Sequence, residues 1–195
     1  MQAYSAMLVY MAVSMITPGP NNLTMLYLGA QYGFRGTRRF FTASAVCLFL
    51  KTLLCGALNV ALASFMPVLI RYLKWLGAAY MIYLGIVMAR SGWKDGTLTG
   101  QQSESTYRSG VILQLLNMKS WVSCLSLYAV YVMPLTTSLR AVVLVAVAYT
   151  VFMILASTCW GLFGSAMRTL CTKYKKPFGI VMGLSLIYCA ITALI

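Results

Sequence analysis

The chain has 195 residues, of which 61% are hydrophobic and only 9% are charged, and its formal net charge is +13. Its mean hydropathy of +0.83 lies outside the range of soluble globular domains, so the sequence predicts an integral membrane protein. In a soluble protein this charge would indicate nucleic-acid binding. Here most basic residues fall between apolar segments, where they act as topology signals, so no nucleic-acid partner is expected.

Six apolar segments are long enough to cross a bilayer core of about 30 Å. The predicted spans cover residues 3–30, 40–66, 70–90, 110–133, 139–166 and 177–195. Because the first basic residue is Arg35, the first segment lacks the positive start of a removable signal peptide and is expected to remain as a span.

The glycine-containing and polar linker at 91–109 divides the chain into a first half, 1–90, and a second half, 110–195. Each half has three spans, an odd number, so the halves are expected to run in opposite directions through the membrane. The predicted fold is therefore all-α, a polytopic membrane bundle of six transmembrane helices. It consists of two inverted three-helix halves with a broken first helix, and residues 1–195 form a single transmembrane domain.

The first span is interrupted by the segment Pro18-Gly19-Pro20-Asn21-Asn22. Proline lacks an amide N–H, so Pro18 and Pro20 should free the carbonyls of Ser14 and Ile16, which lipid cannot satisfy. Broken helices at this depth face protein or a polar cavity, and transporters build substrate sites from them. The five residues of the segment are therefore predicted to bind substrate.

Two lysines lie inside predicted spans. Lys51 is 12 residues beyond Arg39, roughly 18 Å along a helix, and Lys119 is 11 residues beyond Arg108, roughly 16 Å. Both are expected near the middle of the bilayer, where an ionisable group costs about 3 kcal/mol and normally faces a bundle interior. With Asn117, which interrupts the first span of the second half, they complete the predicted site. The alternatives are that Lys119 ties a helix end and that tilt brings Lys51 to an interface.

Other chemistry is disfavoured by the residues that are missing. The chain has no histidine, its only acidic residues are Asp95 and Glu104 in the linker, and its six cysteines show no C-x-x-C spacing. Intramembrane hydrolysis needs a Ser-His pair, paired aspartates or a metal site, so no enzymatic activity, cofactor or metal is expected. A channel and a structural accessory subunit remain as alternatives to a transporter.

The basic residues predict the orientation. Ten of them follow spans one, three and five, whereas the opposite face carries only Arg71, Lys74 and Arg140. The positive-inside rule therefore places both termini outside, in the periplasm of a bacterial cell. The ten are Arg35, Arg38, Arg39, Arg90, Lys94, Arg108, Arg168, Lys173, Lys175 and Lys176.

Several motifs together resemble the lysine exporter and homoserine/threonine resistance family. They are Pro18-Gly19-Pro20-Asn21-Asn22, Gly33-Phe34-Arg35 and Asn117-Met118-Lys119. The segments Leu76-Gly77-Ala78-Ala79-Tyr80 and Leu186-Ile187-Tyr188-Cys189-Ala190 are most similar to the cysteine and O-acetylserine exporter branch. The resemblance implies a multi-pass exporter of amino acids or related metabolites in the bacterial inner membrane. Many members have a proline where this chain has Met118.

A zwitterionic substrate needs partners for both of its charges. For the carboxylate we expect the N–H groups of a helix that restarts at Asn21, namely those of Asn22, Leu23 and Thr24, with Lys119 or Lys51. For the ammonium we expect the carbonyls of Ser14 and Ile16 and the side-chain oxygens of Asn21, Asn22 and Asn117.

Such a site favours small neutral substrates such as cysteine and O-acetylserine, with homoserine or threonine as the alternative. Export is expected to be driven by the proton gradient, as in an antiporter, with Lys51 or Lys119 as the proton carrier. The expected partners are a small-molecule amino-acid substrate, protons and membrane lipid, and a homodimer is left open.

Overall fold

The computed structural model describes residues 2–91 and 102–194, and all regular structure within these ranges is helical. The all-α prediction is therefore confirmed for the described part of the chain. The elements are α1 (Gln2–Ile16), α2 (Pro20–Gly36), α3 (Arg38–Ala57), α4 (Asn59–Ser91), α5 (Gln102–Leu116), α6 (Met118–Ser126), the π-helical η1 (Leu127–Val132), α7 (Leu139–Ala166), α8 (Arg168–Lys173) and α9 (Lys175–Leu194).

The described residues contain four helices that are long and apolar enough to cross a membrane singly. These are α3, the Arg71–Arg90 part of α4, α7 and the Lys175–Leu194 helix α9. A fifth candidate is a bent pair, in which Tyr107–Leu116 and Met118–Val132 meet at 57°. The apolar part of α1, Tyr4–Ile16, is too short to qualify alone. A multi-pass membrane protein follows from these lengths and compositions.

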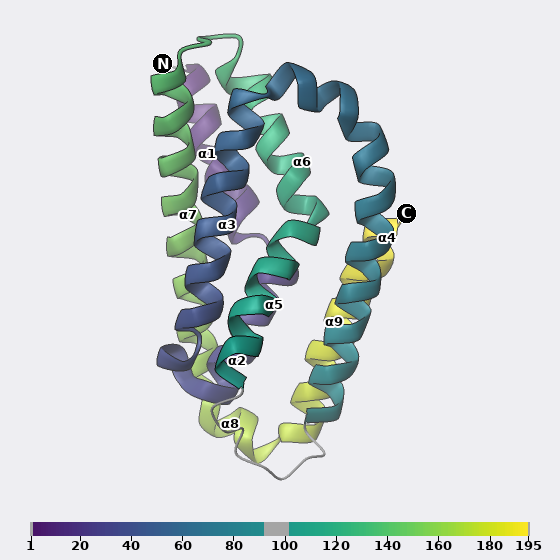
Figure 1. Ribbon diagram of the computed structural model, residues 1–195. Coiled ribbons are helices and arrows are strands. Elements are labelled where there is room, and N and C mark those ends of the chain that lie inside the picture. The colour runs from purple at the N-terminus through teal and green to yellow at the C-terminus, as the bar shows by residue number, and fades with distance from the viewer. Residues whose placement is uncertain (1, 92–101, 195) are drawn as a thin grey trace.

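The helices pack mainly in three pairs: α4 with α9, α2 with α7, and α3 with α5. Figure 1 shows α4 and α9 side by side on one flank of the molecule, with α1, α3 and α7 together on the other. The interrupted helices α5 and α6 lie between these two groups in this view. The first part of α4 arches across one end of the molecule before the helix descends beside α9.

Close glycine contacts hold two of these pairs together. A Cβ on Gly29 or Gly164 would overlap the backbone of the partner helix in the α2–α7 pair, at Gly161 and Leu26 respectively. In the α4–α9 pair, a Cβ on Gly179 would lie 2.7 Å from the carbonyl oxygen of Met88. Small residues let helix backbones approach in this way, and dispersion contacts between them stabilise packing where lipid supplies no hydrophobic driving force.

Two hydrophobic clusters meet at the first helix break. One cluster contains Leu48, Tyr149 and Met153. The other contains Leu23, directly after the Asn21-Asn22 pair, and Leu26. The second part of the segment, Gly19 to Asn22, is buried and faces protein as the sequence predicted, whereas Thr17 and Pro18 are exposed.

Two predicted boundaries are wrong. The predicted gap at 67–69 between spans two and three lies inside α4, whereas the real turn is at Leu58, which leaves helical geometry with φ −115° and ψ 28°. Asn59, which directly follows this turn, and the nearby Gly56 were weak signals inside an otherwise apolar stretch. The predicted linker 91–109 is helical from Gln102 onward, and its residues 92–101 lie outside the described part of the chain.

Candidate functional site

The first break separates α1 from α2 at Thr17-Pro18-Gly19. Gly19 is the N-cap of α2 in an extended conformation, with φ −164° and ψ 175°, and no side chain caps this helix end. Proline suits the first position of a helix because its missing N–H would have no acceptor there. The first N–H groups without an intrahelical acceptor are therefore those of Asn21 and Asn22. The expectation for Leu23 is wrong, because its N–H donates to the Gly19 carbonyl at 2.9 Å.

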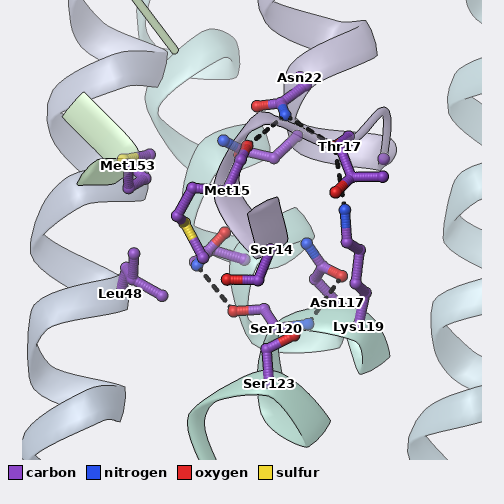
Figure 2. Close-up of a pocket in the computed structure, with 13 residues that line it drawn as sticks. Ser14, Met15, Thr17, Asn22, Leu48, Asn117, Lys119, Ser120, Ser123 and Met153 are labelled. Atoms are coloured by element: carbon purple, nitrogen blue, oxygen red, sulfur yellow. Dashed lines mark hydrogen bonds between the residues drawn. The ribbon is translucent and has the colours of Figure 1, made fainter. Parts of the chain in front are cut away.

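Protein donors already occupy the carbonyls at the end of α1. The Asn22 side chain donates through Nδ2 to the carbonyls of Met15 at 2.8 Å and Thr17 at 3.0 Å. Lys119 Nζ, from the second half of the chain, also donates to the Thr17 carbonyl, at 2.9 Å. The two helix breaks are thus joined by a direct hydrogen bond, which Figure 2 shows.

The Ile16 carbonyl, which was expected to receive a substrate ammonium, has a different partner. It accepts a hydrogen bond from Trp160 Nε1 of α7 at 3.2 Å. The sequence correctly placed the loss of helical hydrogen bonding here, but this oxygen is not free for a ligand. An indole from a distant helix supplies the missing donor.

The second break lies at Asn117, between α5 and α6, and it forms without a proline. Asn117 is the N-cap of α6, with φ −75° and ψ 97°, and its Oδ1 accepts a hydrogen bond from the Ser120 N–H at 3.3 Å. Asparagine is among the strongest N-cap residues, so it both interrupts the span and satisfies the new helix end. Lys119 lies in the first turn of α6, at a helix end as one alternative proposed, and reaches across to the other break.

Lys51 lies behind the second break. Its side chain is only 3% exposed, its Nζ donates to the Gln114 carbonyl at 2.8 Å, and it lies 5.1 Å from the centre of the Trp121 ring. Trp121 Nε1 donates in turn to the Leu115 carbonyl at 2.7 Å. Lys51 and Trp121 therefore satisfy freed carbonyls at the end of α5.

A cavity of about 40 Å³ lies between the two breaks (Figure 2). Of the predicted site residues, it brings together Gly19, Asn21, Asn22, Asn117 and Lys119, whereas Pro18, Pro20 and Lys51 are not in its lining. Ser14, whose carbonyl was expected to bind the ammonium, is also in the lining. Sequence reasoning missed the other lining residues, which are Met15, Thr17, Leu48, Gln114, Ser120, Ser123 and Met153. The serines near the breaks were a weak signal, since serine is common in membrane helices.

One polar atom in the cavity lining lacks a partner. Asn21 Oδ1 is buried without a hydrogen bond, and the whole residue is only 9% exposed. Buried side-chain oxygens are normally satisfied, so an orphaned acceptor in a cavity wall indicates a ligand or water position. No acidic residue is among those that line the cavity. Within the described residues, no group of three or more His, Cys, Asp or Glu side chains is placed to hold a metal ion.

The remaining polar groups of the lining are largely paired with each other. Ser14 Oγ lies 3.1 Å from the Tyr149 hydroxyl and donates to the Met11 carbonyl. Gln114 Nε2 donates to Ser120 Oγ at 3.1 Å. These pairs fix the side chains around the cavity and leave Asn21 as the unsatisfied position.

The chain has apolar helices, two opposed breaks in these helices and a polar cavity between the breaks. These features define a multi-pass membrane protein of the kind that carries small solutes. The LysE type translocator family matches residues 10–195, so the chain belongs to this family.

Curated relatives named cysteine/O-acetylserine efflux protein cover nearly the whole chain. One from a strain of Escherichia coli is 31% identical over 187 residues, 96% of this chain and 95% of its own length. Another from Shigella flexneri is 30% identical with the same coverage. No solved structure matches the chain. The family resemblance seen in the sequence motifs is confirmed, and the protein is a transporter and not an enzyme.

Proposed function

We propose that this protein exports small neutral amino acids and related metabolites, with cysteine and O-acetylserine as its main substrates, from the cytoplasm across the bacterial inner membrane. The names of relatives at 30% and 31% identity support the substrate class. The observation that carries the proposal is the orphaned Asn21 Oδ1 in a cavity wall between two broken helices.

The substrate carboxylate binds at the start of α2. This helix end has no side-chain cap, and the N–H groups of Asn21 and Asn22 have no acceptor within the helix. A helix N-terminus carries partial positive charge, which favours an anion. Lys119 adds a full positive charge when its Nζ leaves the Thr17 carbonyl and donates to the substrate carboxylate instead.

The substrate ammonium binds Asn21 Oδ1, the acceptor without a partner. The cavity lining contains no carboxylate for a second cation, and it already contains Lys119. Lysine or arginine would therefore bring an unpaired charge into a desolvated site, which is costly. Small neutral substrates avoid this cost.

Substrate binding also requires the cavity to widen. A cavity needs about 10–15 Å³ per water molecule, so about 40 Å³ accommodates roughly three waters and less than a complete amino acid. Breaking the hydrogen bond between Lys119 and Thr17 separates the two breaks and enlarges the space.

We further propose a six-span arrangement of two inverted halves, with α1 and α2 as one broken span. The helix pairs support it, because α2 of span one packs on α7 of span five, while α5 of span four packs on α3 of span two. If the first half is superposed on the second, spans one and five take the places of spans four and two, so one pair becomes the other. The same superposition leaves the remaining pair, α4 with α9, unchanged as spans three and six.

Both termini lie in the periplasm in this arrangement, and transport is driven by proton exchange. The charge asymmetry of the connections supports the orientation. Lys119 is the candidate proton carrier, because it lines the cavity and no acidic residue does. Efflux from proteoliposomes that is insensitive to an imposed pH gradient would refute proton coupling. Failure to accumulate substrate against its gradient would favour a channel.

The first test is efflux of labelled cysteine and O-acetylserine from preloaded cells at equal membrane abundance. Asn21→Ala should abolish most efflux, since it removes the proposed ammonium acceptor. Asn59→Ala is the matched control, because Asn59 Nδ2 is also buried without a partner but does not line the cavity. Equal efflux in the intact protein and both variants would refute the proposed site.

A further inference from the structure

The cavity has two chemically different ends. Asn117 and Lys119 lie at its polar end, and Leu48 and Met153 lie at its apolar end. Figure 2 shows Leu48 from α3 and Met153 from α7 together on one side of the cavity, with Lys119 on the opposite side. Met15 extends its thioether from α1 toward the apolar end in the same view.

The apolar end is part of a packed core. Leu48 is completely buried and Met153 is 3% exposed, and both belong to the cluster that contains Cys55, Tyr128 and Tyr149. Protein interiors are packed closely enough that such a wall cannot recede without leaving voids. Leu48 therefore forms a fixed boundary. The two methionines are unbranched and flexible, and they can adapt to different occupants.

We propose that Leu48, Met153 and Met15 form a subsite for the side chain of the substrate, that this subsite takes an uncharged side chain, and that Leu48 sets its depth. This inference rests on the proposed function and names the substrate class of the same site. When the carboxylate and ammonium are held at the polar end, the remaining substituent of the α-carbon points toward Leu48.

The chemistry of the wall excludes charged side chains. Two thioethers and an aliphatic group offer no counter-ion, and burying an unpaired charge costs far more than burying a neutral group. Ser14 and Ser120, between the two ends, already have partners and so provide little selection for polar side chains. A thiol or an ester meets soft, polarizable sulfur atoms, with which such groups pack well.

The size of the subsite predicts a ranking of substrates. Once the cavity has widened, a small side chain such as that of cysteine needs the least further space, and O-acetylserine fits when the methionines move. A neutral side chain that is longer than that of O-acetylserine, such as that of phenylalanine, meets Leu48. A difference of one methylene in an apolar pocket changes specificity by about tenfold or more.

The test measures efflux of labelled cysteine, O-acetylserine and phenylalanine for the intact protein, Leu48→Ala and Leu50→Ala. Leu48→Ala should raise the ratio of phenylalanine to cysteine efflux about tenfold or more, because it deepens the subsite. Leu50→Ala is the matched control, since Leu50 is on the same helix but is 57% exposed and does not line the cavity. Its ratio should equal that of the intact protein.

The outcomes separate the two proposals. If the intact protein exports none of the three substrates, the proposed function fails. If it exports cysteine but the ratio is unchanged in Leu48→Ala, the subsite is wrong while the function stands. If Leu48→Ala does not reach the membrane, Leu48→Val is measured in its place and should show a smaller shift in the same direction.

Discussion

The two helix breaks carry matching sets of caps but differ in how they are closed. Each break has a lysine and a tryptophan on its freed carbonyls: Lys119 and Trp160 at the first, Lys51 and Trp121 at the second. At the second break, Asn117 also caps the new helix, through its own side chain. At the first, the N-cap is Gly19, which has no side chain to do so.

This difference assigns different roles to the two breaks. The second is closed by its own cap and by the buried Lys51, so it forms a fixed part of the framework. The first has an uncapped helix end and is held by Asn22 of α2 together with groups from distant helices. A ligand anion can take the place of the missing cap at the first break only. The predictions below test this contrast, from the largest expected effect to the smallest.

Replacing each lysine by methionine should reveal the largest difference in efflux between the two breaks. Lys119→Met should lower efflux per folded molecule by about 10-fold to 100-fold, because a hydrogen bond to a charged group contributes about 1.5–3 kcal/mol. Lys51→Met should keep efflux within about threefold, because Lys51 does not line the cavity. The measurement is initial efflux rate of labelled cysteine, normalised to the amount of folded protein.

The control for both variants is Lys74→Met. Lys74 Nζ also donates to a backbone carbonyl, that of Leu194, at 3.2 Å, and it is not in the cavity lining. Its efflux should match that of the intact protein. Equal losses in Lys119→Met and Lys51→Met would contradict the different roles of the two breaks.

Adding a cap to the first break should lower transport without unfolding the protein. Gly19→Asn places an amide at a position whose extended backbone accepts any residue, and its Oδ1 can accept the free N–H groups of α2. The new Cβ would lie 3.3 Å from Lys119 Cδ, so the flexible lysine must shift by a few tenths of an ångström. Efflux should fall about tenfold, since one anion-binding contact is blocked. Gly19→Ala, which adds the Cβ but no cap, separates the two effects.

Removing the cap from the second break should affect stability more than transport. Asn117→Ala loses the hydrogen bond to the Ser120 N–H, which as an N-cap contributes about 1 kcal/mol. Thermal unfolding in detergent should therefore occur at a lower temperature, while efflux per folded molecule stays within about twofold. A large efflux loss with unchanged unfolding would mean that Asn117 contacts the substrate.

The tryptophan pair should give the smallest effects. Trp160→Phe and Trp121→Phe each remove one indole hydrogen bond, a contribution of about 0.5–1.5 kcal/mol. Trp160→Phe should change efflux by a few-fold, since it frees the Ile16 carbonyl beside the cavity, whereas Trp121→Phe should mainly lower stability. Efflux and thermal-unfolding measurements on both variants test whether the two tryptophans have these different roles.

The features that sequence reasoning predicted are local exceptions to their surroundings. Prolines and asparagines inside an apolar segment mark the first break, and a single asparagine marks the second. Lys119 is conspicuous as a charge inside a span. The fold class and the α7 boundaries follow from hydropathy, because apolar length depends on nearby residues only. The turn at Leu58 was missed, since the single Gly56 and Asn59 beside it interrupt the apolar stretch too weakly to mark a helix end.

What the sequence could not predict depends on which way helices face. Lys51 and Lys119 have the same chemistry and comparable predicted depth, yet only Lys119 lines the cavity. Likewise, Trp160 is 144 residues from the Ile16 carbonyl that it caps, and no local pattern relates the two. Only tertiary packing distinguishes these cases.

The glycine contacts between α2 and α7 have a consequence for motion. Since these backbones touch at Gly29, Gly161 and Gly164, separating the two helices would lose close packing along much of their length. The two helices therefore move as one unit, which includes Asn21 and Asn22 of α2. Any widening of the first break therefore moves α1 relative to this pair, and it must break the hydrogen bonds from Asn22 to the Met15 and Thr17 carbonyls.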